Sequence, residues 1–265
     1  RAGGISPSPR GERPGASSPA EMTAGRRRIM SGPNAPRVEN KVDVPALKKK
    51  LGRMYVLALA VLGLMLFLPA GTLRFWEAWA YLAILFIPMA GVGIYFFKHD
   101  PEVMERRLRT REKEKTQKKF SLAGFVLFAA AFLIIGFDRR WDWSAVPLVL
   151  VVIADVMVAL GYGIFVLVIR ENRFLLRVVE VEAGQNVISS GPYAVVRHPM
   201  YAGVLLLYLF TPLALGSFWA LIPFGLIAAL FPIRILNEER VLLRDLDGYA
   251  DYMKKTRFRL IPGIW

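Results

Sequence analysis

The stretch YAGVLLLYLFTPLALGSFWALIPFGLIAALFPIRIL, residues 201–236, contains a single charged residue. A Gly-Ser pair at 216–217 divides it into two apolar runs, Tyr201–Gly216 and Phe218–Leu236. A helix rises about 1.5 Å per residue, so the second run can cross the ~30 Å of hydrocarbon in a bilayer. The first run reaches only about 24 Å, which leaves a full crossing and a re-entrant path both open. Because the Gly-Ser pair permits only a tight connection, we expect a helical hairpin.

Four more apolar runs precede this hairpin, and together with it they define the fold class. They are Met54–Gly71, Trp79–Phe97, Phe120–Phe137 and Ala145–Ile169. Hydrophobic residues make up 55% of the 265 residues and gather in these runs, a distribution that excludes an ordinary soluble domain. The sequence therefore predicts an all-α fold, a multi-pass transmembrane helical bundle of five to six spans.

The chain divides into three expected regions. Residues 1–50 are rich in proline, glycine, serine and arginine, and they cannot bury enough apolar surface to offset their ordering entropy, so we expect a disordered basic tail. Residues 51–170 hold the N-terminal transmembrane helices, and residues 171–265 hold the hairpin and the candidate catalytic region. In the loop after the second run, Asp100 and Pro101 predict the start of a surface helix.

Basic residues outnumber acidic ones and lie mostly on one side of the predicted membrane. The formal net charge is +14, and most lysines and arginines lie in segments 26–53, 98–119, 170–199 and after residue 233. Positively charged loops favour the cytoplasm, so we expect both termini and the candidate site on that side. The opposite ends of the runs carry an aromatic belt of Trp76, Trp79, Trp141, Trp143 and Trp219.

Several kinds of chemistry are excluded by composition. Cysteine is absent, which excludes disulfides, zinc–thiolate sites and cysteine nucleophiles. The two histidines, His99 and His198, are too few for a histidine-rich metal site, so we expect no metal. Asp155 is an acid in the middle of an apolar run, where a functional role and a hydrogen bond to a neighbouring helix both stay open.

The segment GPYAVVRHPMYAG, residues 191–203, predicts the start of the hairpin and a binding site. Pro199 suits the first position of a helix, and His198 then lies directly before it. The free amides of this helix start, its dipole and Arg197 would attract an anion such as a carboxylate or phosphate.

Three neighbours of this helix start extend the candidate site. Tyr193 and Tyr201 offer aromatic faces for a cation or a flat ring. Gly203 lets a ligand or another helix approach closely. An ordinary loop-to-helix junction that binds lipid headgroups would explain the same residues.

Two adjacent acids, Glu238 and Glu239, lie where the last apolar run ends. On a helix they point about 100° apart, so they cannot act as one carboxylate dyad. A pair between Arg234 and Glu238, four residues apart, would explain Glu238 without a function. Both ends of the hairpin emerge on one face, so we expect the acids to meet the helix start and to suit a zwitterionic, cationic ligand.

These motifs, followed by the GYADY stretch at 248–252 and RLIPGIW at 259–265, resemble the isoprenylcysteine carboxyl methyltransferase family and the broader group of membrane phospholipid methyltransferases. The resemblance covers about residues 170–265. It implies a multi-pass membrane enzyme that uses S-adenosyl-L-methionine and acts on a lipophilic acceptor, either an isoprenylcysteine carboxylate or a lipid. The chain's compact size is similar to bacterial relatives, so we expect the bacterial cytoplasmic membrane.

The resemblance also implies which residues form the site. It assigns catalytic roles to Arg197, His198 and Tyr201, and a cofactor pocket to Tyr193, Arg197, His198, Pro199, Tyr201, Gly203, Glu238 and Glu239. A carboxylate acceptor needs no base, whereas an amine must lose a proton, and His198 is the near-neutral group nearby. Arg197 would anchor the cofactor or the acceptor, and His198 as a mere structural cap stays open.

Two other functions remain open at this level. Membrane sterol reductases that use NADPH are similar over the Arg-His-Pro and Pro-Gly motifs, but the pair of glutamates favours the methyltransferase. A non-catalytic membrane scaffold with a decayed pocket is the third alternative, and the intact Arg197, His198, Glu238 and Glu239 argue against it.

Overall fold

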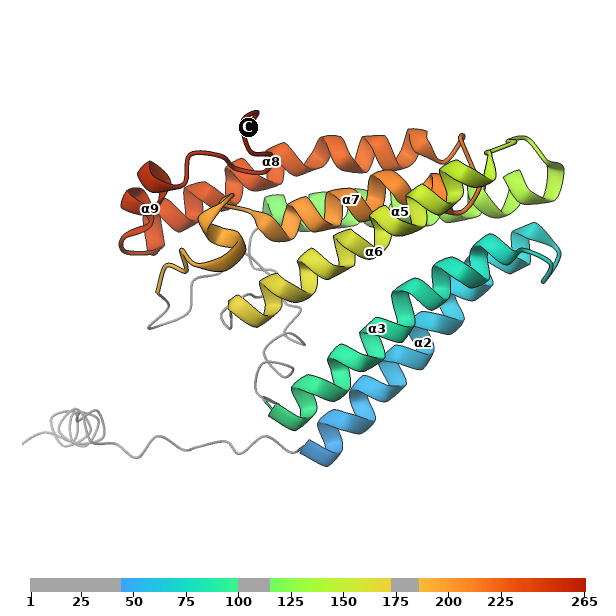
Figure 1. The fold of residues 1–265 in the computed structure, drawn as a ribbon, viewed down its shortest axis with the longest axis horizontal. Coiled ribbons are helices and arrows are strands. Elements are labelled where there is room, and N and C mark those ends of the chain that lie inside the picture. Colours follow the sequence, from blue (N-terminus) through green and yellow to red (C-terminus); the bar gives the residue numbers. More distant parts are fainter. Residues whose placement is uncertain (1–43, 100–114, 173–185) are drawn as a thin grey trace, which may run out of the picture. The chain divides into compact units, whose positions relative to one another are not determined.

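The computed structural model describes residues 44–99, 115–172 and 186–265, and within these ranges it is helical without strands. Each of the six predicted apolar runs corresponds to one long helix (Figure 1). These helices are α2 (Val44–Ala70), α3 (Trp76–His99), α5 (Lys115–Trp141), α6 (Leu148–Glu171), α7 (Pro199–Ala214) and α8 (Leu221–Asp245). A 3-10 helix, η1 (Gly191–Ala194), and a short helix, α9 (Tyr249–Lys255), complete the described part.

The helices confirm the predicted fold class. Among the described residues, α2, α3, α6 and α8 are long and apolar enough to cross a membrane, and α7 is a shorter apolar helix. Their outward side chains are largely apolar, for example Leu68 of α2 at 74% exposure and Ile87 of α3 at 70%. Side chains of this kind are stable in hydrocarbon and not in water, so the chain is an integral membrane protein.

Two boundaries differ from the prediction or lie outside the described residues. Helix α2 begins at Val44, so residues 44–50, which we assigned to a disordered tail, are helical. The lysines of this segment are good helix formers and are exposed, so the membrane helix extends into the polar interface. Residues 1–43 of the predicted tail and the expected surface helix at Asp100 lie outside the described residues.

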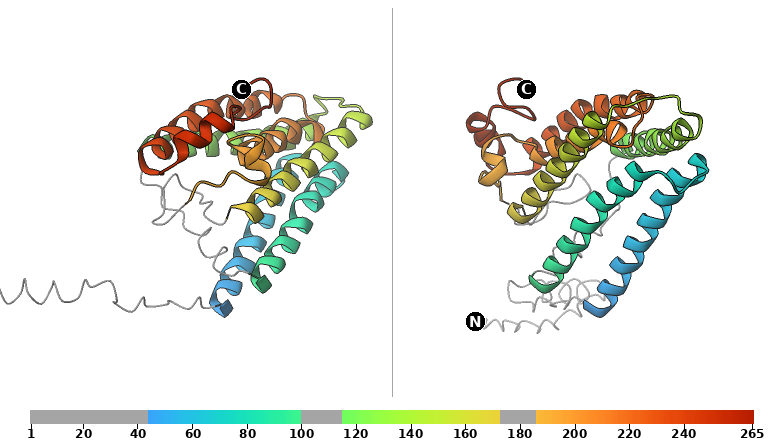
Figure 2. Two further views of the ribbon diagram at one scale, coloured as in Figure 1. Left: turned by 60° about the vertical axis from the view of Figure 1, so that its left-hand side comes forward. Right: turned by 45° about the vertical axis from the view of Figure 1, so that its right-hand side comes forward.

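The C-terminal hairpin contacts both α5 and α6. Helix α7 packs against α6 and α8, α8 also packs against α5, and α3 packs against α6 (Figures 1 and 2). The α7–α8 connection is tight, as predicted, because Gly216 adopts a positive φ of 71°. Buried aromatic rings fill the space between α5 and α8, where Phe132 and Phe224 pack edge to face at 5.8 Å.

A buried acid, Asp138, forms a hydrogen bond to the turn of the hairpin, at the end far from the start of α7. Asp138, at 2% exposure, accepts hydrogen bonds from the backbone N–H of Ser144 at 2.7 Å and from its hydroxyl at 2.6 Å. The hydroxyl of Ser217 donates to the same carboxylate. Asp138 therefore ties the α5–α6 connection to the α7–α8 turn, at the end that carries the exposed Trp141, Trp143 and Trp219.

Helices α6 and α7 touch through their backbones at Gly161 and Gly203. A Cβ atom on Gly161 would lie 2.6 Å from the carbonyl oxygen of Gly203, and one on Gly203 would lie 2.7 Å from that of Gly161. Because backbone atoms cannot rotate away as a side chain can, the two glycines permit a contact that alanine does not.

We expect Gly161→Ala to lower the free energy of unfolding by about 1–3 kcal/mol, since α6 and α7 must separate to admit the methyl group. Gly163→Ala on the same helix is the matched control, because a Cβ there meets nothing within 4 Å. The control should change stability by at most about 1 kcal/mol, through helix propensity alone. Denaturant unfolding in detergent micelles measures both, and equal stability of the two variants would contradict this close helix contact.

Candidate active site at the start of α7

Helix α7 begins where the sequence predicts. Pro199 is its first residue, a position at which the missing N–H costs no hydrogen bond, and His198 precedes it with non-helical dihedral angles. Helix α8 continues beyond its apolar run to Asp245 and so carries Glu238 and Glu239 past the start of α7. The predicted meeting of the two clusters is observed, because the Arg197 Nε lies 2.7 Å from Oε1 of Glu239.

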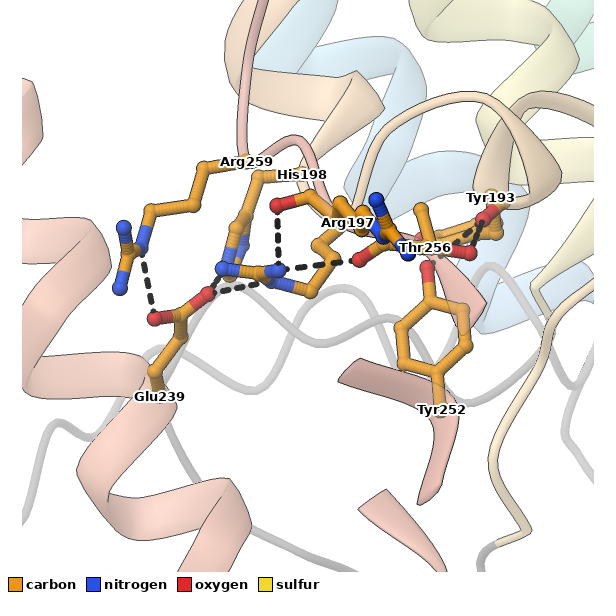
Figure 3. A network of polar contacts seen from close by, with 8 residues as sticks. Tyr193, Arg197, His198, Glu239, Tyr252, Thr256 and Arg259 are labelled. Atoms are coloured by element: carbon orange, nitrogen blue, oxygen red, sulfur yellow. Dashed lines mark hydrogen bonds and ion pairs between the residues drawn. The ribbon is translucent and has the colours of Figure 1, made fainter. Parts of the chain in front are cut away.

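Glu239 is the centre of a buried polar network (Figure 3). Its carboxylate, at 4% residue exposure, accepts hydrogen bonds from Arg197 at Oε1 and from the Nε of Arg259 at Oε2, the latter at 2.8 Å. His198 Nε2 lies 3.3 Å from Oε1. Such a charge-assisted network is stable in a buried position only with its partners in place.

The hydrogen bond of His198 determines its tautomer. A carboxylate oxygen accepts, so Nε2 of His198 carries the hydrogen that points to Glu239. His198 occupies the N-cap position of α7, but its imidazole makes no capping hydrogen bond to the α7 amides. Nδ1 is the ring nitrogen that does not contact Glu239.

Arg197 also holds the C-terminal tail. Its Nη1 donates to the carbonyl oxygens of Thr256 at 2.9 Å and Arg257 at 2.8 Å. The backbone N–H groups of Arg197 and His198 donate to the carbonyls of Phe258 and Arg259, at 2.9 and 2.8 Å. The tail thus runs beside residues 197–198, held by these backbone hydrogen bonds, and the guanidinium of Arg197 is buried beneath it at 6% residue exposure.

Glu238 belongs to a second polar group around Tyr201. The Tyr201 hydroxyl donates to Oε2 of Glu238 at 2.7 Å and accepts from the Nε of Arg234 at 2.8 Å. The two adjacent glutamates therefore serve different partners, as their angular separation on a helix requires. Tyr201 connects Arg234 and Glu238, so the predicted pairing of these two residues occurs through a hydroxyl.

Three tyrosines form an aromatic layer beside the network. The hydroxyl of Tyr252 donates to the carbonyl oxygen of Tyr193 at 2.7 Å, and the side-chain amide of Asn172 donates to the hydroxyl of Tyr193 at 3.0 Å. Burial raises the pKa of Tyr252 to about 12, so this phenol stays protonated and keeps donating at neutral pH. The buried hydroxyl of Tyr249 has no hydrogen-bond partner among the described residues.

A cavity of about 550 Å³ lies between α5, α7 and α8, next to Tyr201. Its wall is mostly apolar and aromatic, and Tyr201 and Arg234 supply the polar atoms at one part of it. The lining residues are Gly124, Phe125, Phe128, Tyr201, Val204, Tyr208, Ile227, Leu230, Phe231 and Arg234. Tyr201 is thus shared by the cavity and the polar group around Glu238.

The structure brings together most of the predicted site residues, whereas Gly203 contacts another helix. Gly203 faces Gly161, so it serves the approach of another helix, the second of the two alternatives for this glycine. Asp155 Oδ1 is buried without a hydrogen-bond partner among the described residues, so this atom does not make the bond to a neighbouring helix that was one of the two alternatives. The sequence analysis did not place Arg259 or Arg234 in the site. Arg259 was named only within the C-terminal motif 259–265, and Arg234 only as a helical partner of Glu238.

Comparison with known proteins supports the motif-based interpretation. The phospholipid methyltransferase (PEMT) family model matches residues 149–246, a range that spans α6 to the end of α8 and contains Arg197, His198, Tyr201, Glu238 and Glu239. This match confirms the resemblance to membrane phospholipid methyltransferases. No curated protein matches the chain.

A search of solved structures finds the eukaryotic intramembrane Ras methyltransferase ICMT (isoprenylcysteine carboxyl methyltransferase), in a structure without a monobody. The TM-score is 0.41 and the sequence identity 14%, over 92% of this chain and 91% of that chain.

Proposed function

We propose that the chain is a membrane methyltransferase that transfers the methyl group of S-adenosyl-L-methionine to a lipophilic acceptor. The observation that carries this proposal is the arrangement of residues inside the matched range 149–246. There, a buried charged network at the start of α7 lies next to an apolar cavity of about 550 Å³, and Tyr201 belongs to both surroundings. A polar donor and an apolar acceptor need two such adjacent environments.

The chemistry of the donor set fits S-adenosyl-L-methionine, which supplies an electrophilic methyl group on a sulfonium. The site offers guanidinium groups for its carboxylate, the acids Glu238 and Glu239 for its ammonium or ribose, and aromatic rings for its cationic sulfur. The buried, unpartnered hydroxyl of Tyr249 is a further polar atom that a ligand can satisfy. We assign the cofactor pocket to Tyr193, Arg197, His198, Pro199, Tyr201, Glu238 and Glu239. Gly203, which was predicted to belong to the pocket, packs against Gly161 instead.

The cavity favours an acceptor with an apolar body. Phe125, Phe128 and Phe231 would contact that body, while Tyr201 and Arg234 would orient its reactive group. A carboxylate oxygen reacts without a base, whereas an amine must first lose a proton. Nδ1 of His198, the ring nitrogen that does not contact Glu239, would take that proton. Lipids and isoprenylcysteine carboxylates both have an apolar body of this kind.

The site is assigned to the cytoplasmic face of a bacterial membrane, with both termini on that side. The basic residues of the tail, such as Arg257, lie at the end of the hairpin that carries the site, and the exposed Trp141, Trp143 and Trp219 lie at the other end. Basic segments on the cytoplasmic side and tryptophans at the interface agree with this orientation.

Methyl transfer from radiolabelled S-adenosyl-L-methionine into a lipid extract tests the proposed function. The purified protein should place the label in an organic-soluble product and should bind the donor, but not NADPH, in a calorimetric titration. Binding of NADPH alone would identify the sterol reductase alternative, and binding of neither compound would identify a non-catalytic protein.

We expect Val204→Trp to reduce the kcat/KM for the lipophilic acceptor at least about tenfold while donor affinity is unchanged, because the indole would fill the cavity beside Tyr201. Leu209→Trp introduces the same ring on the same helix at an exposed position and is the control. Acceptor kinetics and donor titration on both variants check this. Equal acceptor kinetics in the two would show that the acceptor binds elsewhere.

A further inference from the structure

The two arginines that bind Glu239 differ in how much of each guanidinium is available. The side chain of Arg197 is 5% exposed, and its Nε and Nη1 already make three hydrogen bonds to protein atoms. The side chain of Arg259 is 29% exposed, and only its Nε is bound, to Glu239. No hydrogen bond of its terminal nitrogens to any described residue is present. A ligand that reaches the network therefore meets Arg259 with two donor groups available.

Arg259 is also held in a fixed orientation. Its backbone N–H donates to the carbonyl oxygen of Trp265 at 2.9 Å, and its carbonyl accepts from the N–H of His198 at 2.8 Å. The guanidinium lies over the ring of Trp265, 5.3 Å from the centroid. With Nε fixed by Glu239, the two terminal nitrogens form one edge of a preorganised fork, the geometry that binds a carboxylate with two parallel hydrogen bonds.

The charge of the network favours an anion at this edge. Arg197 and Arg259 together carry two positive charges, and Glu239, the acid that both of them bind, carries one negative charge. Figure 3 shows Arg259 at one end of the network, so an anion can bind it without displacing Arg197 from Glu239. A bound carboxylate would complete the pairing of a half-buried charge, which is worth more than a pair at the surface.

We propose that Arg259, and not Arg197, binds the carboxylate of the methyl donor. This inference rests on the proposed function and changes the role of Arg197. Arg197 holds the tail through Thr256 and Arg257 and fixes Glu239, so it is a positioning residue that acts through Arg259. Glu239 shares this role because it fixes the Nε of Arg259.

A donor analogue without the carboxylate tests the assignment. Decarboxylated S-adenosylmethionine retains the sulfonium, the ammonium and the adenosine, so its affinity reports every contact except that of the carboxylate. Wild-type protein should bind the complete donor at least about tenfold more tightly than the analogue. In Arg259→Gln, the affinity for the complete donor should fall to about that for the analogue, whereas the affinity for the analogue should not decrease.

Arg257→Gln is the matched control, because it removes the same charge from an exposed side chain two residues away. It should keep the wild-type preference for the complete donor. Arg259→Lys keeps the positive charge but lacks the two parallel terminal nitrogens, so it should keep only part of the preference for the complete donor. The part that remains would show that the tail still folds in this variant.

Three outcomes would overturn the inference. If Arg259→Gln keeps the wild-type preference, the carboxylate is bound elsewhere, and if it weakens both ligands equally, Arg259 only supports the fold. If vesicles of phosphatidylglycerol bind wild-type protein but not Arg259→Gln, while the donor preference is unchanged, the anion is a lipid headgroup. Failure of wild-type protein to bind the donor at all would instead refute the proposed function itself.

Discussion

Arg197→Ala should abolish measurable donor binding and lower the free energy of unfolding by about 3–5 kcal/mol. The substitution removes one partner of the buried Glu239 carboxylate and leaves the carbonyl oxygens of Thr256 and Arg257 without their donor. Because Glu239 is buried and the two carbonyls lie in buried or part-buried hydrogen bonds, each loss leaves a polar group without its partner and costs part or all of its desolvation. The tail should then detach from residues 197–198, and Arg259 would be displaced with it.

Arg240→Ala is the control for this variant. Arg240 is exposed and follows Glu239 directly on α8, so its removal changes the net charge equally without breaking a buried bond. Denaturant unfolding and calorimetric titration of the donor should show a large change for Arg197→Ala and a change within about 0.5 kcal/mol for Arg240→Ala. Equal behaviour of the two variants would contradict the role of Arg197 as the clamp of the tail. Arg197→Lys should be intermediate, because an ammonium cannot reproduce the planar set of donors.

The parts of the fold that depend on local sequence could be predicted. In a bilayer, apolar runs of about 20 residues can satisfy their backbone hydrogen bonds only as helices. Six helices and the hairpin therefore follow from the distribution of apolar residues along the chain. The start of α7 at Pro199 follows from the missing N–H of proline, and the tight turn follows from Gly216. Residues 44–50 were wrongly assigned to the disordered tail, and this error also comes from local sequence. A lysine-rich segment is typical of a polar tail, although lysine also forms helix readily.

The site could be predicted only in part, because its partners are far apart in the sequence. The hairpin brings Arg197 and Glu239 to the same face, so their meeting followed from topology. The position of Arg259 did not, since it depends on how the tail returns along residues 197–198 through backbone hydrogen bonds that any residue types can make. Gly203 shows the same limit: its small size predicted a close approach, and only the structure identifies Gly161 as the neighbour.

Glu239→Gln should destabilise the protein by about 3–5 kcal/mol, about as much as Arg197→Ala does. This cost is expected although glutamine and glutamate have nearly the same shape. The amide is neutral, so Arg197 and Arg259 lose the charge that balances them, and the amide NH₂ must face one of these donors. Glu238→Gln is the matched control on the neighbouring residue. Its amide oxygen can still accept from the Tyr201 hydroxyl, so the cost should be about 1 kcal/mol.

The combination of Arg197→Ala with Glu239→Ala separates a shared network from two independent contacts. If each residue is buried chiefly because the other is present, removing both leaves no unpaired charge between them, and the double variant should be less destabilised than the sum of the two single variants. We expect a coupling of about 1.5–3 kcal/mol from unfolding measurements on the four proteins of the cycle. The residual cost would then measure the contacts that each residue makes without the other. These are the bonds of Arg197 to the carbonyls of Thr256 and Arg257 and the bonds of Glu239 to Arg259 and His198. Strict additivity would show that the two residues contribute independently, Arg197 through the tail and Glu239 through Arg259.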